Sequence, residues 1–270
     1  MTATPFERPR EFAGKTHFTK AEAAEWERTW LKRLIDDEDE IDRMGADLNE
    51  IYLDDRKVLA DLRTSLILDP ANGRLPSLVK AAEARRAART KPNYDDPEAR
   101  PLGERCILGL DGGLPVTAPI VPNQYAGNFY QIVQTPHHVL IFTEQIHDAR
   151  IIRIGGTHIP SAIQRWLGDS VGYWEGDTLV VDTTNVHEKA AFRGATPRIH
   201  VIERLTRTGP TTITYRATVD DPDTWASAWT LEFPFQATAL RPFEYACHEG
   251  NRAVEGVLRG ARAEEKARRK

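Results

Sequence analysis

The sequence predicts a mainly β protein, an antiparallel β-barrel that is wrapped by N-terminal helices and closed by a short C-terminal helix. From Phe129 onward, short segments rich in β-branched and aromatic residues alternate with turn residues. Several of these turns are too short for a parallel crossover, so the strands that they join must be antiparallel neighbours. Before this region the apolar residues follow a helical period. We therefore expect a helical wrap over residues 1–60, a barrel over 61–258 and a basic tail over 259–270.

Composition narrows the classes of function. The chain has 270 residues, of which 40% are hydrophobic and 28% charged, so it can bury a core of its own. A net charge of −4 gives no overall positive field to hold phosphates, and we predict no nucleic-acid partner. No apolar run is long enough to cross a bilayer, and the first residues show no apolar leader. We expect no membrane association and a cytoplasmic protein, or a periplasmic one if a leader has been removed; a homodimer is one option for its oligomeric state.

The first predicted helix begins at a capping box. Thr19 and Glu22 have the spacing in which each side chain caps a backbone N–H of the other. Trp26 and Trp30 then lie one turn apart on the same helix face. This pattern is typical of packing anchors.

The elements between this helix and the barrel follow from charge and turn residues. The acidic stretch 36–55 is typical of a solvated linker. A β-branched strand over 63–69 ends in a Pro/Asn/Gly turn, and an alanine- and arginine-rich helix follows over about 77–90. A proline-rich connection then leads toward the barrel.

Eight segments of the second half are predicted strands: 129–135, 138–145, 149–154, 170–174, 177–185, 200–208, 211–220 and 228–236. Gly176-Asp177 supplies the positive φ of a tight hairpin, and Thr208–Thr211 joins the next pair of strands. A short helix, Arg252–Arg259, is expected after the last strand, and the basic tail beyond it is expected to fray.

Cys106 and Cys247 are the two cysteines of the chain, 141 residues apart. Their polar surroundings predict that they meet in space, with Cα atoms within about 7 Å. In a cytosolic protein the pair would stay reduced, which is the state we expect; in an exported protein it would form a disulfide.

Candidate chemistry gathers at three places in the strand region. Glu144, His147, Asp148 and Arg150 lie within seven residues, and a β-bulge would bring Glu144 and His147 together, with Arg150 as the local partner of the carboxylate. The alternative is an edge strand whose charges form salt bridges at the surface.

The second place is a strand on which His200 and Arg204 share one face while Glu203 points the other way. The third is the segment containing Tyr245 and His248. The catalytic candidates are thus His147, Glu144, Arg150, His200, Glu203 and Arg204.

Aromatic and polar side chains of the barrel could line a cavity for an apolar or aromatic molecule, or they could simply fill the core. The candidate substrate-binding residues are Tyr130, Gln131, Phe142, Asp148, Trp174, Tyr245 and His248. The sequence contains none of the GxSxG, GxGxxG, P-loop, HExxH or CxxC motifs. No histidine spacing enforces a metal site, and we predict no metal and no cofactor.

Two functions are compatible with these residues. The first is a cofactor-independent lyase, dehydratase or isomerase, with His147 or His200 as acid or base, Glu144 or Glu203 orienting it, and an arginine stabilising negative charge. The alternative is a non-catalytic barrel that carries or sequesters a small hydrophobic ligand. A metal-assisted hydrolase is a third possibility.

The motifs RWLGDSVGYWEGDTLVVDTTN, EQIHDARII, FRGATPRIHVIERLTR and YACHEGN, together with RTSLILDPANGRLP near the front, resemble a large, poorly characterised family of bacterial proteins common in acidobacteria and sphingomonads. The resemblance covers nearly the whole chain from Pro5. It implies a lipocalin-like (calycin-type) barrel with an N-terminal helical wrap, and it implies no particular reaction.

Overall fold

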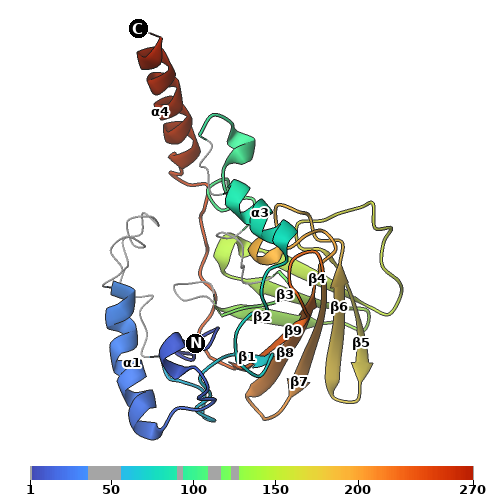
Figure 1. Cartoon of the computed structure of the whole chain (residues 1–270). Helices are drawn as coiled ribbons and strands as arrows, with labels where there is room; N and C mark the ends of the chain where they lie inside the picture. The colour runs from blue at the N-terminus through green and yellow to red at the C-terminus, as the bar shows by residue number, and fades with distance from the viewer. Residues whose placement is uncertain (1, 36–55, 90–93, 109–116, 123–127, 270) are drawn as a thin grey trace.

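The computed structural model of the chain describes residues 2–35, 56–89, 94–108, 117–122 and 128–269. A nine-stranded mixed sheet dominates it, with the strand order β1-β9-β8-β7-β6-β5-β4-β3-β2 (Figure 1). The strands are β1 Ile67–Asp69, β2 Tyr130–Gln134, β3 His138–Thr143, β4 Ala149–Ile154, β5 Asp169–Glu175, β6 Thr178–Thr184, β7 His200–Arg207, β8 Thr212–Asp220 and β9 Trp229–Gln236. The predicted mainly β class is confirmed. The sheet curls strongly, but its end strands β1 and β2 do not pair, so the sheet is open.

All eight predicted barrel strands form, as β2 to β9. Gly176 takes a φ of +57° in the hairpin that joins β5 to β6, as the turn requires. The strands pair antiparallel, as expected, except at one place, where β4 and β5 pair in parallel. The 14 residues 155–168 between these strands are enough for the chain to cross back to the starting edge.

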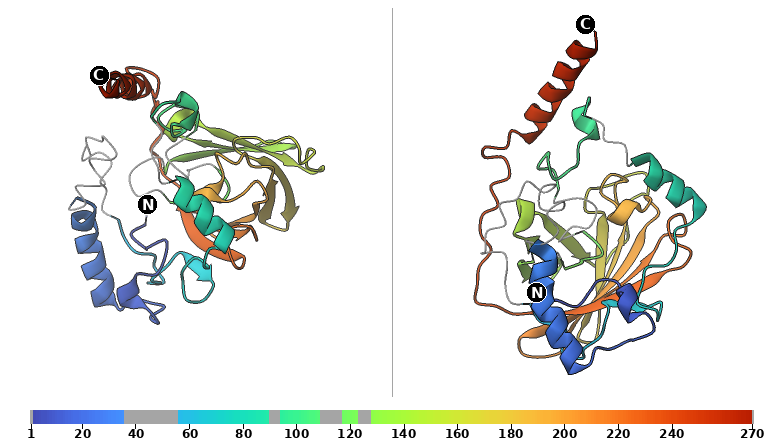
Figure 2. Two further views of the ribbon diagram at one scale, coloured as in Figure 1. Left: turned by 45° about the horizontal axis from the view of Figure 1, so that its top comes forward. Right: turned by 60° about the vertical axis from the view of Figure 1, so that its left-hand side comes forward.

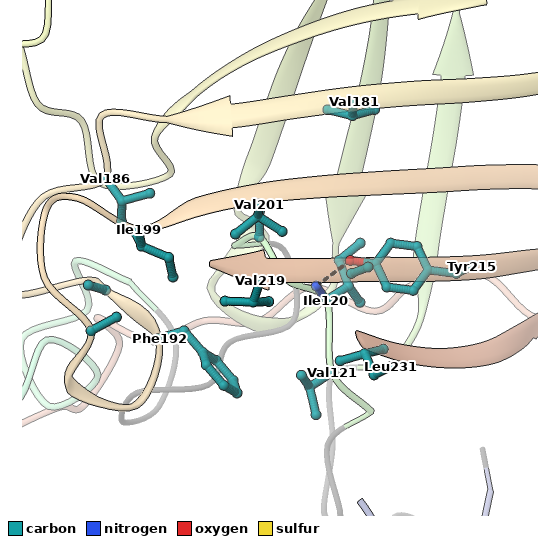
Figure 3. Close-up of a cluster of buried hydrophobic side chains, with 14 of the residues drawn as sticks. Ile120, Val121, Val181, Val186, Phe192, Ile199, Val201, Tyr215, Val219 and Leu231 are labelled. Carbon is teal, nitrogen blue, oxygen red and sulfur yellow. Dashed lines mark hydrogen bonds between the residues drawn. The ribbon is translucent and has the colours of Figure 1, made fainter. Parts of the chain in front are cut away.

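One face of the curled sheet carries the main core. Successive residues of a strand point to opposite faces, so Val201, Glu203 and Leu205 of β7 point inward while His200 and Arg204 point outward. This division was predicted correctly. Figure 3 shows the enclosed side chains of β6 to β9 gathered on this inner face, with the segment around Ile120 lying across them.

The N-terminal helix α1, Lys20–Ile35, has its own small core beside the sheet (Figure 1). The capping box forms: the Glu22 N–H donates to Oγ1 of Thr19, and the Thr19 N–H donates to Oε2 of Glu22. Trp26 is buried, and its Nε1 donates to the Ala3 carbonyl at 2.8 Å. Trp26 is therefore a packing anchor, as predicted, and Trp30 packs at the edge of the same cluster.

The described residues form two further α-helices. The predicted alanine- and arginine-rich helix forms as α3, Lys80–Arg89, and the predicted acidic linker 36–55 lies outside the described residues. The C-terminal helix α4 runs over Ala253–Arg268 and projects away from the sheet, with no buried residue (Figure 2). The expectation that this helix would end at Arg259 is wrong, because its glutamates and arginines pair along the helix at favourable spacings. Within the described ranges, no helix has the length and apolar character needed to cross a membrane.

The two cysteines meet as predicted, with Cα atoms 5.8 Å apart. They form a disulfide between the proline-rich connection and the C-terminal segment, so the expectation of reduced thiols is wrong in this structure. Besides this bond, the Asn251 side chain donates to the Glu104 carbonyl and Arg262 of α4 pairs with Asp95, so the C-terminal segment is held to the proline-rich connection at several points.

The disulfide predicts the thiol content of the protein. Protein purified without reductant and unfolded in guanidinium should react with no equivalents of a thiol reagent, and with two equivalents after reduction. The Cys106→Ser/Cys247→Ser variant should unfold at a lower denaturant concentration, because a cross-link over so long a loop stabilises by about 4 to 5 kcal/mol on the chain-entropy model. Two reactive thiols before reduction would contradict the bond.

Candidate functional site

A buried ion pair crosses the inner face of the sheet. Nη1 of Arg150, on β4, lies 2.7 Å from Oε2 of Glu203 on β7, and Nη2 lies 2.8 Å from Oε1. The side chains are 1% and 0% exposed. The expectation that Arg150 would pair with Glu144 beside it is wrong, because the curl of the sheet brings β7 within reach of the inward-pointing guanidinium.

Tyr215 extends this ion pair into a hydrogen-bonded network. Its hydroxyl donates to Oε1 of Glu203 at 2.7 Å. The same hydroxyl accepts the Ile120 N–H at 2.7 Å (Figure 3). Burial raises the pKa of the Tyr215 hydroxyl well above its ordinary range, and the neighbouring carboxylate raises it further. Both oxygens of Glu203 are thus occupied by donors that keep their protons, which leaves this carboxylate poorly suited to act as a base.

Two buried polar atoms beside the network lack hydrogen-bond partners among the described residues: Nε of Arg150 and Oη of Tyr130. Burial raises the pKa of the Tyr130 hydroxyl, and the positive charge of Arg150 offsets only part of this effect. Tyr130 is therefore a neutral proton donor at neutral pH.

A large cleft opens at the end of the curled sheet. Its volume is about 1380 Å³, and its walls come from β2 and β3 on one side and from the β7–β8 hairpin and β9 on the other. The rings of Tyr130 and Phe235 meet across it, with centroids 5.2 Å apart. Phe235 also contacts Tyr215, at 5.6 Å, so an aromatic layer separates the cleft from the buried ion pair.

Three of the predicted binding residues line this cleft: Tyr130, Gln131 and Phe142. Two aromatic residues of β9, Phe233 and Phe235, also line it and were not singled out from the sequence. Their alternation along β9 was a visible signal, since residues two apart on a strand share a face.

A second group of titratable residues lies on the outer face of β5 to β7. His158 contacts two carboxylates, with Nδ1 2.9 Å from Oδ2 of Asp169 and Nε2 3.1 Å from Oδ1 of Asp182. Nε2 of His200 lies 2.9 Å from the same Asp182 oxygen. His200 was predicted as a site residue, but its partners were not, because they depend on strand register and on the path of the β4–β5 crossover.

Asp169 ties that crossover to the sheet. Its side chain is 1% exposed and accepts hydrogen bonds from Arg153 and from the Ile159 N–H. Burial alone would raise the pKa of the Asp169 carboxyl, but the bonds from His158 and Ile159, with the charge of Arg153, outweigh it and lower the pKa.

The segment between β3 and β4 forms a one-turn 3₁₀ helix, Gln145–His147, in place of the predicted bulge. Glu144 is buried and accepts the Phe243 N–H at 2.8 Å, whereas His147 is exposed. Asp148 lies half-buried just before β4. In the described parts of the chain, no hydrogen bond joins the side chains of Glu144 and His147.

The remaining predicted site residues are scattered. Arg204 pairs with Glu175 on the outer face, and Trp174 is 45% exposed near the β5–β6 hairpin. Tyr245 and His248 flank the disulfide in the C-terminal segment. The structure therefore divides the predicted residues among the cleft, the buried network, the β3–β4 segment, the outer face and the chain end.

The described residues contain no group of three histidine, cysteine or carboxylate side chains placed to hold a metal ion. Comparisons of the chain with protein-family models, curated proteins and solved structures found no match. The family resemblance of the sequence motifs therefore stays a prediction.

Breaking the buried Arg150–Glu203 pair should cost more stability than breaking the exposed Arg204–Glu175 pair. Glu203→Gln should lower the free energy of unfolding by about 3 to 5 kcal/mol, because it leaves the Arg150 charge buried and unpaired. Glu175→Gln, which breaks an exposed pair, should cost less than about 1 kcal/mol. Urea unfolding measures both, and equal losses would contradict the assigned role of the buried pair.

Asp169 predicts a pH dependence of stability. Its folded-state pKa lies below the unfolded value of about 3.9, so its contribution is complete above that value and is lost as the pH falls through the folded-state pKa. Asp169→Asn should cost about 1.5 to 3 kcal/mol at pH 7. In urea unfolding at a series of pH values, the difference from the wild type should shrink below pH of about 4. A difference that does not change with pH would refute the carboxylate's role.

Proposed function

We propose that this protein binds a small apolar or aromatic molecule in the cleft at the end of its curled sheet. The observation that carries the proposal is the composition of the cleft lining. Aromatic and aliphatic side chains from both walls dominate it, and the described residues that line it include no aspartate, glutamate or histidine. Such a lining suits burial of an apolar body and offers little for acid–base chemistry.

The rigidity of the aromatic layer supports the same function. Tyr215 stacks near Phe233 and Phe235, with centroids 5.1 and 5.6 Å away, and its hydroxyl is held by Glu203 and Ile120. Aromatic side chains that are already held in place lose little conformational freedom when a ligand binds against them, and this favours affinity.

For the architecture, we propose a lipocalin-like barrel whose open side is this cleft. The contact between Tyr130 of β2 and Phe235 of β9 supports it, since β2 lies at one end of the strand order and β9 lies next to the strand at the other end.

For the cellular compartment of the protein, we propose an oxidising one, which the Cys106–Cys247 disulfide supports.

The alternative function, a cofactor-independent lyase, dehydratase or isomerase, has one observation in its favour. Asp182 orients His200 and His158 through one oxygen, which is how a carboxylate commonly tunes a histidine acid or base. These residues lie on the outer face of the sheet, away from the cleft, so blocking the cleft separates the two functions.

The neutral fluorescent probe N-phenyl-1-naphthylamine tests the binding function. The wild type should bind it with increased fluorescence. Ile132→Trp/Ile213→Trp places indoles on two walls of the cleft and should weaken binding about tenfold or more.

The matched control is Val133→Trp/Thr214→Trp, which adds the same indoles one position away on β2 and on β8, on the opposite face of the sheet and outside the cleft lining. It should bind the probe as the wild type does. Equal affinities of the two double variants would show that the probe does not occupy the cleft, and no binding by the wild type would overturn the proposal.

A further inference from the structure

We propose that the ligand of the cleft is an amphipathic acid, whose anionic carboxylate or sulfonate group is bound by Arg207 at the rim while its apolar body lies on the aromatic floor. This inference rests on the proposed function and adds the chemical class of the ligand. It starts from the signs of the charges around the cleft.

The charged residues of the cleft lining are Lys57, Arg207 and Arg241, all cationic. The whole chain has more acidic than basic residues, 40 against 36, so a wall with cations alone departs from its average surface. The cationic lining attracts an anion that enters this cleft. The described lining residues include no carboxylate that would repel it.

Arg207 is placed to use this charge. It ends β7 on the inner face of the sheet, where its register partner is Ile213 on β8, whose own partner is Phe235 on β9. All three line the cleft. One cross-strand row thus begins with a cation and continues with two apolar side chains, which matches a molecule with an anionic head and an apolar body.

The local partners of these cations differ. The ammonium of Lys57 lies 3.2 Å from a carboxylate oxygen of Glu27, which neutralises it. Arg207 and Arg241 are exposed, and neither forms an ion pair with any residue in the described ranges. Their charges are therefore uncompensated by the protein that surrounds them.

The guanidinium of Arg207 is held in position by neutral groups. Its Nε donates to the Gly209 carbonyl at 3.3 Å, and Nη2 donates to the Pro210 carbonyl at 2.7 Å, both in the β7–β8 hairpin. Nη1 has no hydrogen-bond partner among the described residues. A pre-oriented guanidinium with N–H groups left over is suited to binding the oxygens of a carboxylate or sulfonate.

Two probes with the same ring system test the inference. 8-Anilino-1-naphthalenesulfonate carries a sulfonate that N-phenyl-1-naphthylamine lacks. Arg207→Gln should weaken binding of the sulfonate about tenfold and leave the affinity for the neutral probe within twofold. Arg207→Lys should give an intermediate loss, because it keeps the charge without the planar fork.

Arg216→Gln is the matched control, because Arg216 pairs with Glu232 on the outer face of the sheet. It should bind both probes as the wild type does, and added salt should weaken sulfonate binding more in the wild type than in Arg207→Gln. If Arg207→Gln affects both probes equally, or neither, the inference is overturned while the proposed function stands. If the neutral probe fails to bind the wild type, the proposed function falls and the inference with it.

Discussion

The contact between Arg150 and Glu203 sets the shape on which the other features depend. β4 and β7 are three positions apart in the strand order, so a flat sheet would separate them by about 14 Å. The two side chains meet through two hydrogen bonds of 2.7 and 2.8 Å, and this is possible only because the sheet curls around its inner face. A buried ion pair adds little net stability compared with well-packed apolar residues. We infer that its main role is to hold one curvature and one register.

The curl of the sheet explains both the cleft and the aromatic layer beneath it. Glu203 positions Tyr215, and Tyr215 in turn packs beside Phe233 and Phe235. The same curl brings Tyr130 of β2 against Phe235 of β9, so the ends of the strand order face each other across the cleft. The buried charges of Arg150 and Glu203 therefore satisfy one another behind an aromatic layer, and the cleft in front of that layer is left apolar with a cationic rim.

Much of the fold could be predicted from the sequence, because its signals are local. Alternating β-branched residues marked all eight strands from β2 to β9, and Gly176 marked a hairpin by its need for positive φ. The parallel pairing of β4 with β5 could not be predicted, since the crossover 155–168 contains no regular element that reveals its direction. The pairing of Arg150 with Glu203 was missed for a related reason: it depends on curvature between residues 53 apart in sequence.

The candidate site was predictable only in part. Tyr130, Gln131 and Phe142 were identified because aromatic and amide side chains on a predicted barrel strand suggest a cavity, but nothing local to Arg207 distinguishes it from a surface arginine. Likewise, Asp182 joins His158 and His200 only after the register of β6 with β7 is known. Side chains that act across strands are set by register, which a sequence read along one strand does not reveal.

We propose that a small molecule binds in the cleft between β2 and β9 and not on the outer face. Backbone amide chemical shifts of the labelled protein, recorded by NMR during titration with N-phenyl-1-naphthylamine, distinguish the two places. We expect the largest changes at Tyr130, Ile213 and Phe235, with little change around Asp182. Changes concentrated at His158, Asp182 and His200, with Tyr130 and Phe235 unaffected, would contradict it.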